Sequence, residues 1–166
     1  YALSNKMVDA VLAIKKGQDI YDAVPTIITN PEELADTAGS LHCGTVLLAK
    51  VAQKFQESSP GRKLAVTVKG CDLIALHEIA KRDGVDLSKL LLIGVNCGGT
   101  VSPVKARSMI QDVYQINPDI VHKEEIDKGQ FIIEYEGGHK GISIDELEEE
   151  GYGRRSNCRR CLYKVP

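Results

Sequence analysis

The sequence predicts an α/β protein with a mainly parallel sheet covered by helices, a C-terminal β-hairpin and a cysteine-bearing loop. Over residues 1–116, short apolar runs alternate with segments of helical periodicity, which is typical of a parallel sheet. After Asn117-Pro118 the pattern changes to two strand-like runs around a Gly-Gly turn. We therefore expect an α/β core over residues 1–116, then a hairpin and a basic C-x-x-C loop over residues 117–166, all in one domain.

The first third of the chain predicts two strands and two helices. Residues 8–14 and 26–29 are short apolar runs with β-branched side chains, and we expect both to be strands. Asn30, followed by a proline and two acidic residues, has the composition of a capped helix start. We expect that helix to end near Thr37. Apolar residues at helical spacing predict a further helix over residues 46–55.

The middle of the chain predicts two parallel strands with a helix between them. Residues 64–68 alternate as a strand does, and residues 90–95 form an apolar run typical of a fully buried strand. Residues 72–81 have the periodicity of an amphipathic helix. The side chains expected to face the core are Leu73, Ile74, Leu76 and Ile79.

The C-terminal third predicts a helix, a hairpin and an acidic turn. Ser102, with a proline after it, is an N-cap pattern for a helix that reaches about Tyr114. Residues 131–136 and 141–144 are strand-like, and the glycine pair between them favours a β-hairpin. Residues 145–150 are mostly acidic and predict a solvated helical turn.

Composition and charge exclude several classes of partner. The formal net charge of −2 does not suggest a protein that binds nucleic acid or an anionic membrane. No apolar run approaches the roughly 20 residues that cross a bilayer, and no signal peptide is visible, so we expect a cytoplasmic location without a membrane span. The chain begins at Tyr1 in helix-like sequence and ends just after a cysteine pair. We expect it to be a piece of a longer subunit.

The strongest functional signal is the placement of the cysteines. Their odd number, without a secretory context, disfavours a disulfide framework. Cys71 and Cys97 each follow one of two neighbouring strands, so we expect both at the edge where open α/β sheets bind ligands. Cys158 and Cys161 form a C-x-x-C pair in an aperiodic loop. Cys43 has no partner in this count and is expected to be a buried structural thiol.

Four such thiolates are the ligand set of a cubane iron–sulfur cluster. A helix N-terminus lowers a thiol pKa, which favours Cys71 as a thiolate. Arginines around the C-x-x-C pair would offset the charge of a cluster; they are Arg154, Arg155, Arg159 and Arg160. Tetrahedral zinc takes the same number of ligands, and from the residues alone the two metals are equally favoured. A redox dithiol, or ordinary small core residues, are further alternatives.

A second group of residues is a candidate for cofactor binding. Gly98, Gly99 and Thr100 follow a strand and precede a helix start, where glycines allow close approach and the helix end favours a phosphate. A plain strand-to-helix turn explains them as well. Lys69 could bring a positive charge to a flavin ring or an acidic coenzyme; an exposed lysine without a role is the alternative. His42 is either a cofactor contact or a hydrogen-bonded loop residue.

Four segments occur in the order of a known family. They are residues 37–40 (TAGS) after a Pro-Glu-Glu-Leu helix, 69–72 (KGCD) after a strand, 96–100 (NCGGT) and 155–161 (RSNCRRC). The whole chain resembles the beta subunits of deazaflavin-coenzyme-reducing hydrogenases and formate dehydrogenases of methanogenic archaea. Residues 12–30, 39–43 and 123–131 are most similar to the formate dehydrogenase branch.

The resemblance implies cofactors and partners. It implies FAD, which converts the hydride of a deazaflavin coenzyme into single electrons, with Ser40 and His42 in a loop that borders the flavin. It also implies a 4Fe-4S cluster, which favours iron–sulfur over zinc; the implied ligands are Cys71, Cys97, Cys158 and Cys161. The implied partner is a catalytic formate dehydrogenase or hydrogenase subunit in a larger redox complex. Members of the family have a glycine-rich segment that contributes to flavin binding and would precede Tyr1. The FAD site is therefore expected to be incomplete in this chain.

The sequence leaves three functions open. The first is an oxidoreductase subunit that couples the deazaflavin coenzyme, through FAD and the cluster, to formate oxidation on a partner, with a hydrogenase-linked branch as its variant. The second is an electron relay that has the cluster but no substrate of its own. The third is a zinc-stabilised structural module. The colour and the metal content of an anaerobic preparation separate the three.

Overall fold

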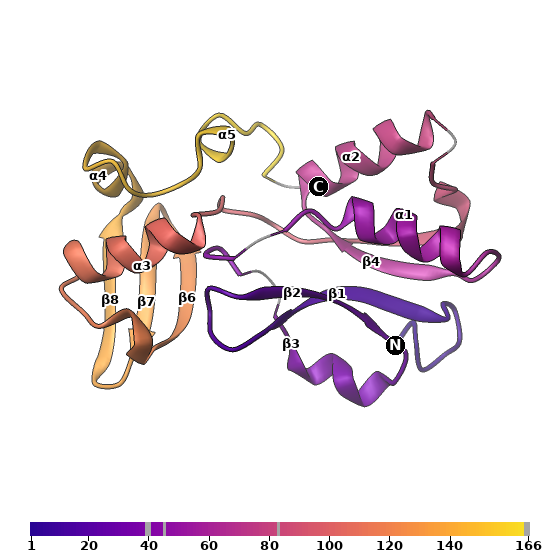
Figure 1. Cartoon of the computed structure of the whole chain (residues 1–166), viewed down its shortest axis with the longest axis horizontal. Coiled ribbons are helices and arrows are strands. Elements are labelled where there is room, and N and C mark those ends of the chain that lie inside the picture. Colours follow the sequence, from indigo (N-terminus) through magenta and orange to yellow (C-terminus); the bar gives the residue numbers. More distant parts are fainter. Residues whose placement is uncertain (39–40, 45, 83, 165–166) are drawn as a thin grey trace.

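The computed structural model of the chain describes residues 1–38, 41–44, 46–82 and 84–164. Over these residues it forms two β-sheets side by side, with helices packed on each (Figure 1). The elements of the first part are β1 (Ala10–Lys16), β2 (Ala23–Ile28), η1 (Pro31–Asp36), β3 (Thr37–Ala38), α1 (Ala49–Ser58), β4 (Leu64–Val68), α2 (Gly70–Ala80), η2 (Leu87–Lys89) and β5 (Leu90–Gly94). Those of the second part are α3 (Pro103–Asp112), η3 (Pro118–Ile120), β6 (Val121–Asp127), β7 (Gln130–Tyr135), β8 (Gly138–Ser143), α4 (Ile144–Glu149) and α5 (Ser156–Arg159).

The first sheet is mixed, and its central strands are parallel. Among the described residues the strand order is β2-β1-β4-β5, and β3 also pairs with β1. β4 runs parallel to both β1 and β5, whereas β2 and β3 run antiparallel to β1. The register of β4 and β5 pairs Val68 with Gly94, so both strands end at the same edge. The predicted α/β class, with its parallel strands and C-terminal hairpin, is confirmed.

Helices α1 and α2 cover one face of the first sheet. Leu12 and Val66 from the strands pack there with Phe55 of α1 and Leu76 of α2. The opposite face has a smaller cluster, which includes Ala65 and is closed by the N-terminal segment. The buried side chains are mainly aliphatic, as the lack of Trp requires. Burial of this apolar surface is the main stabilising contribution and fixes where β4 and α2 meet.

Two expectations about burial are wrong, one for strand β5 of this sheet and one for helix α2 that covers it. β5 forms where predicted, but Leu91 and Ile93 are 36% and 41% exposed because β5 is an edge strand of the described sheet. An apolar run by itself does not distinguish a central strand from an edge strand. In α2, Leu76 is fully buried, whereas Ile74 is 39% exposed and does not face the core.

The predicted helix starts at Asn30 and Ser102 are confirmed. The Asn30 side chain accepts a hydrogen bond from the N–H of Glu32, although the helix it caps is a 3-10 helix. The Ser102 side chain accepts a hydrogen bond from the N–H of Lys105 at the start of α3. Both caps satisfy backbone donors that a helix start leaves without partners.

The second sheet is an antiparallel meander of β6, β7 and β8 within the described residues. The predicted hairpin is β7–β8. Strand β6 was not predicted, because its sequence (VHKEEID) is mostly charged, and only Val121 and Glu124 of it are buried. Helix α3 packs on this sheet through Met109 and Ile110.

The C-terminal segment joins the two parts of the molecule. It runs from α4, beside the second sheet, through α5 to the start of α2 (Figure 1). This path brings the C-x-x-C pair to the edge of the first sheet. Within the described residues, no helix has the length and apolar character needed to cross a membrane.

Candidate metal centre

All four predicted ligand cysteines line one cavity beyond the ends of β4 and β5. The cavity has a volume of about 530 Å³. Cys71 comes from the first turn of α2, Cys97 from the loop after β5, and Cys158 and Cys161 from the C-terminal segment. All four are free thiols. The fold therefore gathers thiols from three separate segments at the predicted edge of the sheet.

Backbone contacts hold the C-terminal segment against the other two segments. The N–H of Cys97 donates to the carbonyl of Lys164 at 2.8 Å, and the N–H of Arg155 donates to the carbonyl of Thr100 at 2.7 Å. A Cβ at Gly70 would lie 2.2 Å from the carbonyl oxygen of Tyr163, so only glycine allows this approach. The cavity wall is therefore built by main-chain hydrogen bonds.

Cys158 lies in the short helix α5, and Cys161 lies two residues after the end of that helix. The N–H of Cys158 donates to the carbonyl of Arg155 at 2.8 Å, and the N–H of Cys161 donates to that of Cys158 at 3.3 Å. Thr100 is buried, and its Oγ1 lies 3.3 Å from Cys158 Sγ. Thr100 thus contacts a predicted ligand directly, in the same cavity.

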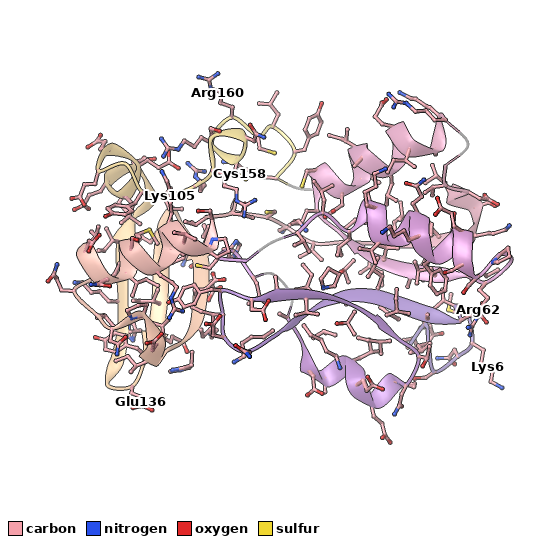
Figure 2. All side chains as sticks on the ribbon, in the orientation of Figure 1. Lys6, Arg62, Lys105, Glu136, Cys158 and Arg160 are labelled. Carbon is pink, nitrogen blue, oxygen red and sulfur yellow. The ribbon has the colours of Figure 1, made fainter. Side chains whose placement is uncertain are left out.

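The four arginines near the pair do not act alike. Arg154 and Arg159 both form ion pairs with Glu148. The distance from Nε to a carboxylate oxygen is 2.7 Å for Arg154 and 3.7 Å for Arg159. Arg160 projects away from the ribbon (Figure 2), whereas Arg155 lines the cavity. Of the four, only Arg155 lines the cavity, and compensation of a cluster charge by the arginines stays a prediction.

Lys69 is buried, so the alternative of an exposed lysine without a role is wrong. Its Nζ lies 2.7 Å from Asp72 Oδ2, and both side chains are almost fully buried. Lys69 lines the cysteine cavity. Asp72 was not predicted as part of the site, although an acidic residue three positions into a helix is the pattern of an N-terminal cap partner.

Burial raises the pKa of Cys71 and of Cys97 above the usual range for a thiol. Asp72 raises the pKa of Cys71 further, and the Lys69 ammonium lowers the pKa of both thiols. The expected lowering at the start of α2 is therefore wrong for Cys71, because desolvation outweighs the effect of the helix end. Cys43 is fully buried in an apolar cluster, as predicted for a structural thiol.

The candidate cofactor residues divide between two adjoining cavities. Gly99, Thr100 and Lys69 line the cysteine cavity, whereas His42 and Gly98 line a neighbouring one of about 370 Å³. Cys97 and Lys164 line both cavities. The remaining candidate, Ser40, lies outside the described residues.

The two glycines have packing roles. A Cβ at Gly98 would lie 2.5 Å from Ile126 Cγ2, and a Cβ at Gly99 would lie 2.5 Å from Arg154 Cδ. Gly99 also has φ +116°, which disfavours any other residue. These positions require glycine for the turn itself, and a role in cofactor approach stays a prediction.

Comparison with known proteins identifies the family. Residues 61–166 match the C-terminal domain family described for the coenzyme F420 hydrogenase/dehydrogenase beta subunit, and residues 1–53 match the corresponding N-terminal domain family. The chain belongs to this beta-subunit family. The resemblance predicted from the four segments is thereby confirmed.

Two relatives of the beta-subunit family align with the whole chain. It is 50% identical over 167 residues to the F420-dependent formate dehydrogenase subunit beta of Methanocaldococcus jannaschii. It is 48% identical over 167 residues to the F420-dependent formate dehydrogenase 1 subunit beta of Methanococcus maripaludis. The alignments cover 100% of this chain but 43% and 42% of the relatives, so the chain spans less than half of their length.

A solved structure shows the same fold, and a further relative is similar in sequence. A chain in a structure of the F420-reducing [NiFe] hydrogenase complex from Methanosarcina barkeri superimposes with a TM-score of 0.83 at 20% identity. That match covers 99% of this chain and 57% of the other. The coenzyme F420 hydrogenase subunit beta of Methanococcus voltae is 21% identical over 163 residues, covering 97% of this chain and 57% of the relative. The structural match supports the arrangement of elements described above.

In this member of the beta-subunit family, the loop that contains His42 is held by a buried carboxylate that the sequence did not indicate. Glu124 Oε1 accepts hydrogen bonds from the N–H groups of His42 and Cys43, at 2.5 Å and 3.3 Å. Glu124 Oε2 is buried without a hydrogen-bond partner among the described residues. His42 Nδ1 lies 2.8 Å from the carbonyl oxygen of Gly99. Glu124 thus links β6 to the loop after β5 through His42.

We expect ionised Glu124 to destabilise the fold relative to a neutral amide. Burial raises the pKa of Glu124, whereas an unfolded Glu titrates near about 4.3. Below that pH both states are protonated, and the group makes no difference to stability. As the pH rises through the raised folded-state pKa, the folded state binds more protons than the unfolded state, so stability is lost. We expect no such loss of stability in Glu124→Gln, because the amide does not ionise and still has an acceptor oxygen.

The measurement is the difference in the free energy of unfolding between wild type and Glu124→Gln, by chemical denaturation at a series of pH values. We expect the wild type to lose stability relative to the variant as the pH rises from acid to neutral. Glu136→Gln is the matched control, because it removes the same charge from an exposed turn of the same sheet. A difference that stays constant across this pH range would contradict the prediction.

Proposed function

We propose that this chain is the part of an F420-dependent formate dehydrogenase beta subunit that holds one 4Fe-4S cluster and passes electrons through it. The observation that carries the proposal is the convergence of four free thiols from three segments on one cavity. The identity of about half to the formate dehydrogenase relatives supports the branch.

The size of the cavity that the four thiols line supports a cluster over a single zinc ion. In tetrahedral zinc sites the thiolates lie at about 2.3 Å from one ion. In the described part of the chain, no three His, Cys, Asp or Glu side chains are close enough to hold one metal ion. A cubane places irons and sulfides between its ligands, so its four thiolates stand further apart around a larger space. The four thiols around a cavity of about 530 Å³ fit that requirement.

The residues of the chain have distinct roles in this proposal. When bound, the cluster supplies one-electron transfer. The four cysteine thiolates bind it, and Thr100 Oγ1, 3.3 Å from Cys158 Sγ, provides a hydrogen bond at a ligand sulfur. Val46, Leu47 and Tyr163 line the same cavity with apolar surface.

FAD and the deazaflavin coenzyme complete the proposed path. FAD accepts a hydride and releases single electrons, so it connects the coenzyme to the cluster. The cavity lined by His42 and Gly98 adjoins Cys97, and a flavin there would lie next to a cluster ligand. The proposed flavin contacts that line this cavity are His42 and Gly98, whereas Gly99 and Thr100 line the adjoining cysteine cavity. Formate oxidation would take place on a partner catalytic subunit, and a cytoplasmic location stays a prediction.

A hydrogenase-linked beta subunit is the second candidate. It rests on the shared fold with the Methanosarcina barkeri hydrogenase complex. The identity of 21% to the hydrogenase beta subunit of Methanococcus voltae, against 50% to a formate dehydrogenase subunit, favours the formate branch. A relay with the cluster alone differs from both by the absence of flavin.

Replacing Cys97 with Ser is expected to abolish the bound cluster, because it removes one of four ligands. The measurement is the iron and acid-labile sulfide content of the anaerobically purified full-length subunit. Cys43→Ser is the matched control, since Cys43 lies in an apolar cluster away from the cavity, and it should keep the iron of the wild type. Unchanged iron in Cys97→Ser, or one zinc in place of iron in the wild type, would contradict the proposal.

His42→Ala is expected to lower flavin content without removing iron, because His42 lines the second cavity and not the first. The readout is flavin released from the full-length subunit on denaturation, relative to iron. His139→Ala, at an exposed position of β8, is the control. Equal flavin in wild type and His42→Ala would remove His42 from the site, and no flavin in the wild type would support the cluster-only relay.

A further inference from the structure

Lys69 is a buried cation in the wall of the cysteine cavity. Its side chain is 7% exposed, and its Nζ lies 2.7 Å from the fully buried Asp72. Asp72 also accepts hydrogen bonds from the N–H groups of Leu48, at 2.7 Å, and of Lys69 itself, at 3.2 Å. A buried charge is stable only with such partners. Asp72 therefore fixes the ammonium at this wall and keeps it from solvent.

The ammonium has a donor left for a group in the cavity. Of its three N–H bonds, one is directed to Asp72, and Val46 offers a more distant carbonyl acceptor at 3.5 Å. Among the residues that the structure describes, the third has no acceptor. The cavity that Lys69 lines contains the four thiols. The ammonium is thus placed to interact with negative charge there.

Lys69 lies beside thiols from two different segments. Its side chain lines the same cavity as Cys71 of α2 and Cys97 of the loop after β5. Charges interact more strongly where water is excluded. Arg155 and Lys164 also line the cavity, but both are exposed, so solvent and salt screen them. Lys69 is therefore the cavity cation with the strongest expected influence.

We propose that Lys69 stabilises the reduced metal centre, because its buried ammonium compensates the negative charge that one added electron brings into this cavity. The inference rests on the function proposed above. It assigns Lys69 to the thiols rather than to the flavin or the coenzyme, and it makes Asp72 the residue that positions Lys69. The electron comes from the flavin in the working subunit, or from dithionite in a titration. No bond or proton changes at Lys69.

Cluster potentials depend on nearby charge, on hydrogen bonds to the sulfurs and on solvent exposure. Removing Lys69 should therefore shift the midpoint potential to a more negative value. The test is a redox titration of the anaerobic full-length beta subunit, followed by electron paramagnetic resonance, for wild type, Lys69→Met, Lys69→Arg and Lys164→Met. We expect the negative shift in Lys69→Met alone. Lys69→Arg keeps the charge, and Lys164→Met removes an equal but exposed charge from the same cavity.

Every other outcome of this titration either supports or overturns the proposed role of Lys69. A Lys69→Met subunit that keeps its cluster, with an unchanged or more positive potential, overturns the inference while the proposed function stands. If Lys69→Met loses the cluster and Lys69→Arg keeps it, the result supports charge compensation by residue 69, because the positive charge is then needed for the cluster to bind. If both lose it, packing alone explains Lys69 and the inference is overturned. A wild-type subunit without a reducible cluster overturns the proposed function, and this inference with it.

Discussion

The candidate site depends on the main-chain pairing between the C-terminal segment and the loop after β5. The hydrogen bonds from Cys97 to Lys164 and from Arg155 to Thr100 close this contact. Without them, Cys158 and Cys161 would have no fixed relation to the sheet. With them, residues that are distant in the sequence share one cavity. Main-chain bonds suit this purpose, because they do not depend on the side chains that must remain available as ligands.

A second constraint is the balance of charge around the thiols of the cavity. Burial disfavours thiolates, which raises the pKa of Cys71 and of Cys97, and the cation of Lys69 opposes that effect. The cation is itself buried and is held by Asp72. Replacing one member of such a pair leaves an uncompensated charge, which is more costly than the pair is stabilising. The same pair that anchors the start of α2 therefore also sets the electrostatic environment of the cavity.

Patterns in the sequence predicted the strands that carry the site but not how the site is completed. β4 and the caps at Asn30 and Ser102 follow from local composition, which acts over a few residues. β6 was missed because an edge strand whose side chains are mostly charged has no apolar signal. The burial of Lys69 and the role of Glu124 depend on contacts between distant segments. No local pattern in the sequence reports such contacts.

The most direct test of the central claim locates the metal itself. Crystals of the full-length subunit, grown without oxygen, would give anomalous diffraction measured on both sides of the iron absorption edge. We predict iron peaks inside the cavity, bonded to the sulfurs of Cys71, Cys97, Cys158 and Cys161. A cavity whose only metal signal appears at the zinc edge, or iron bound elsewhere while these four sulfurs remain without metal, would contradict it.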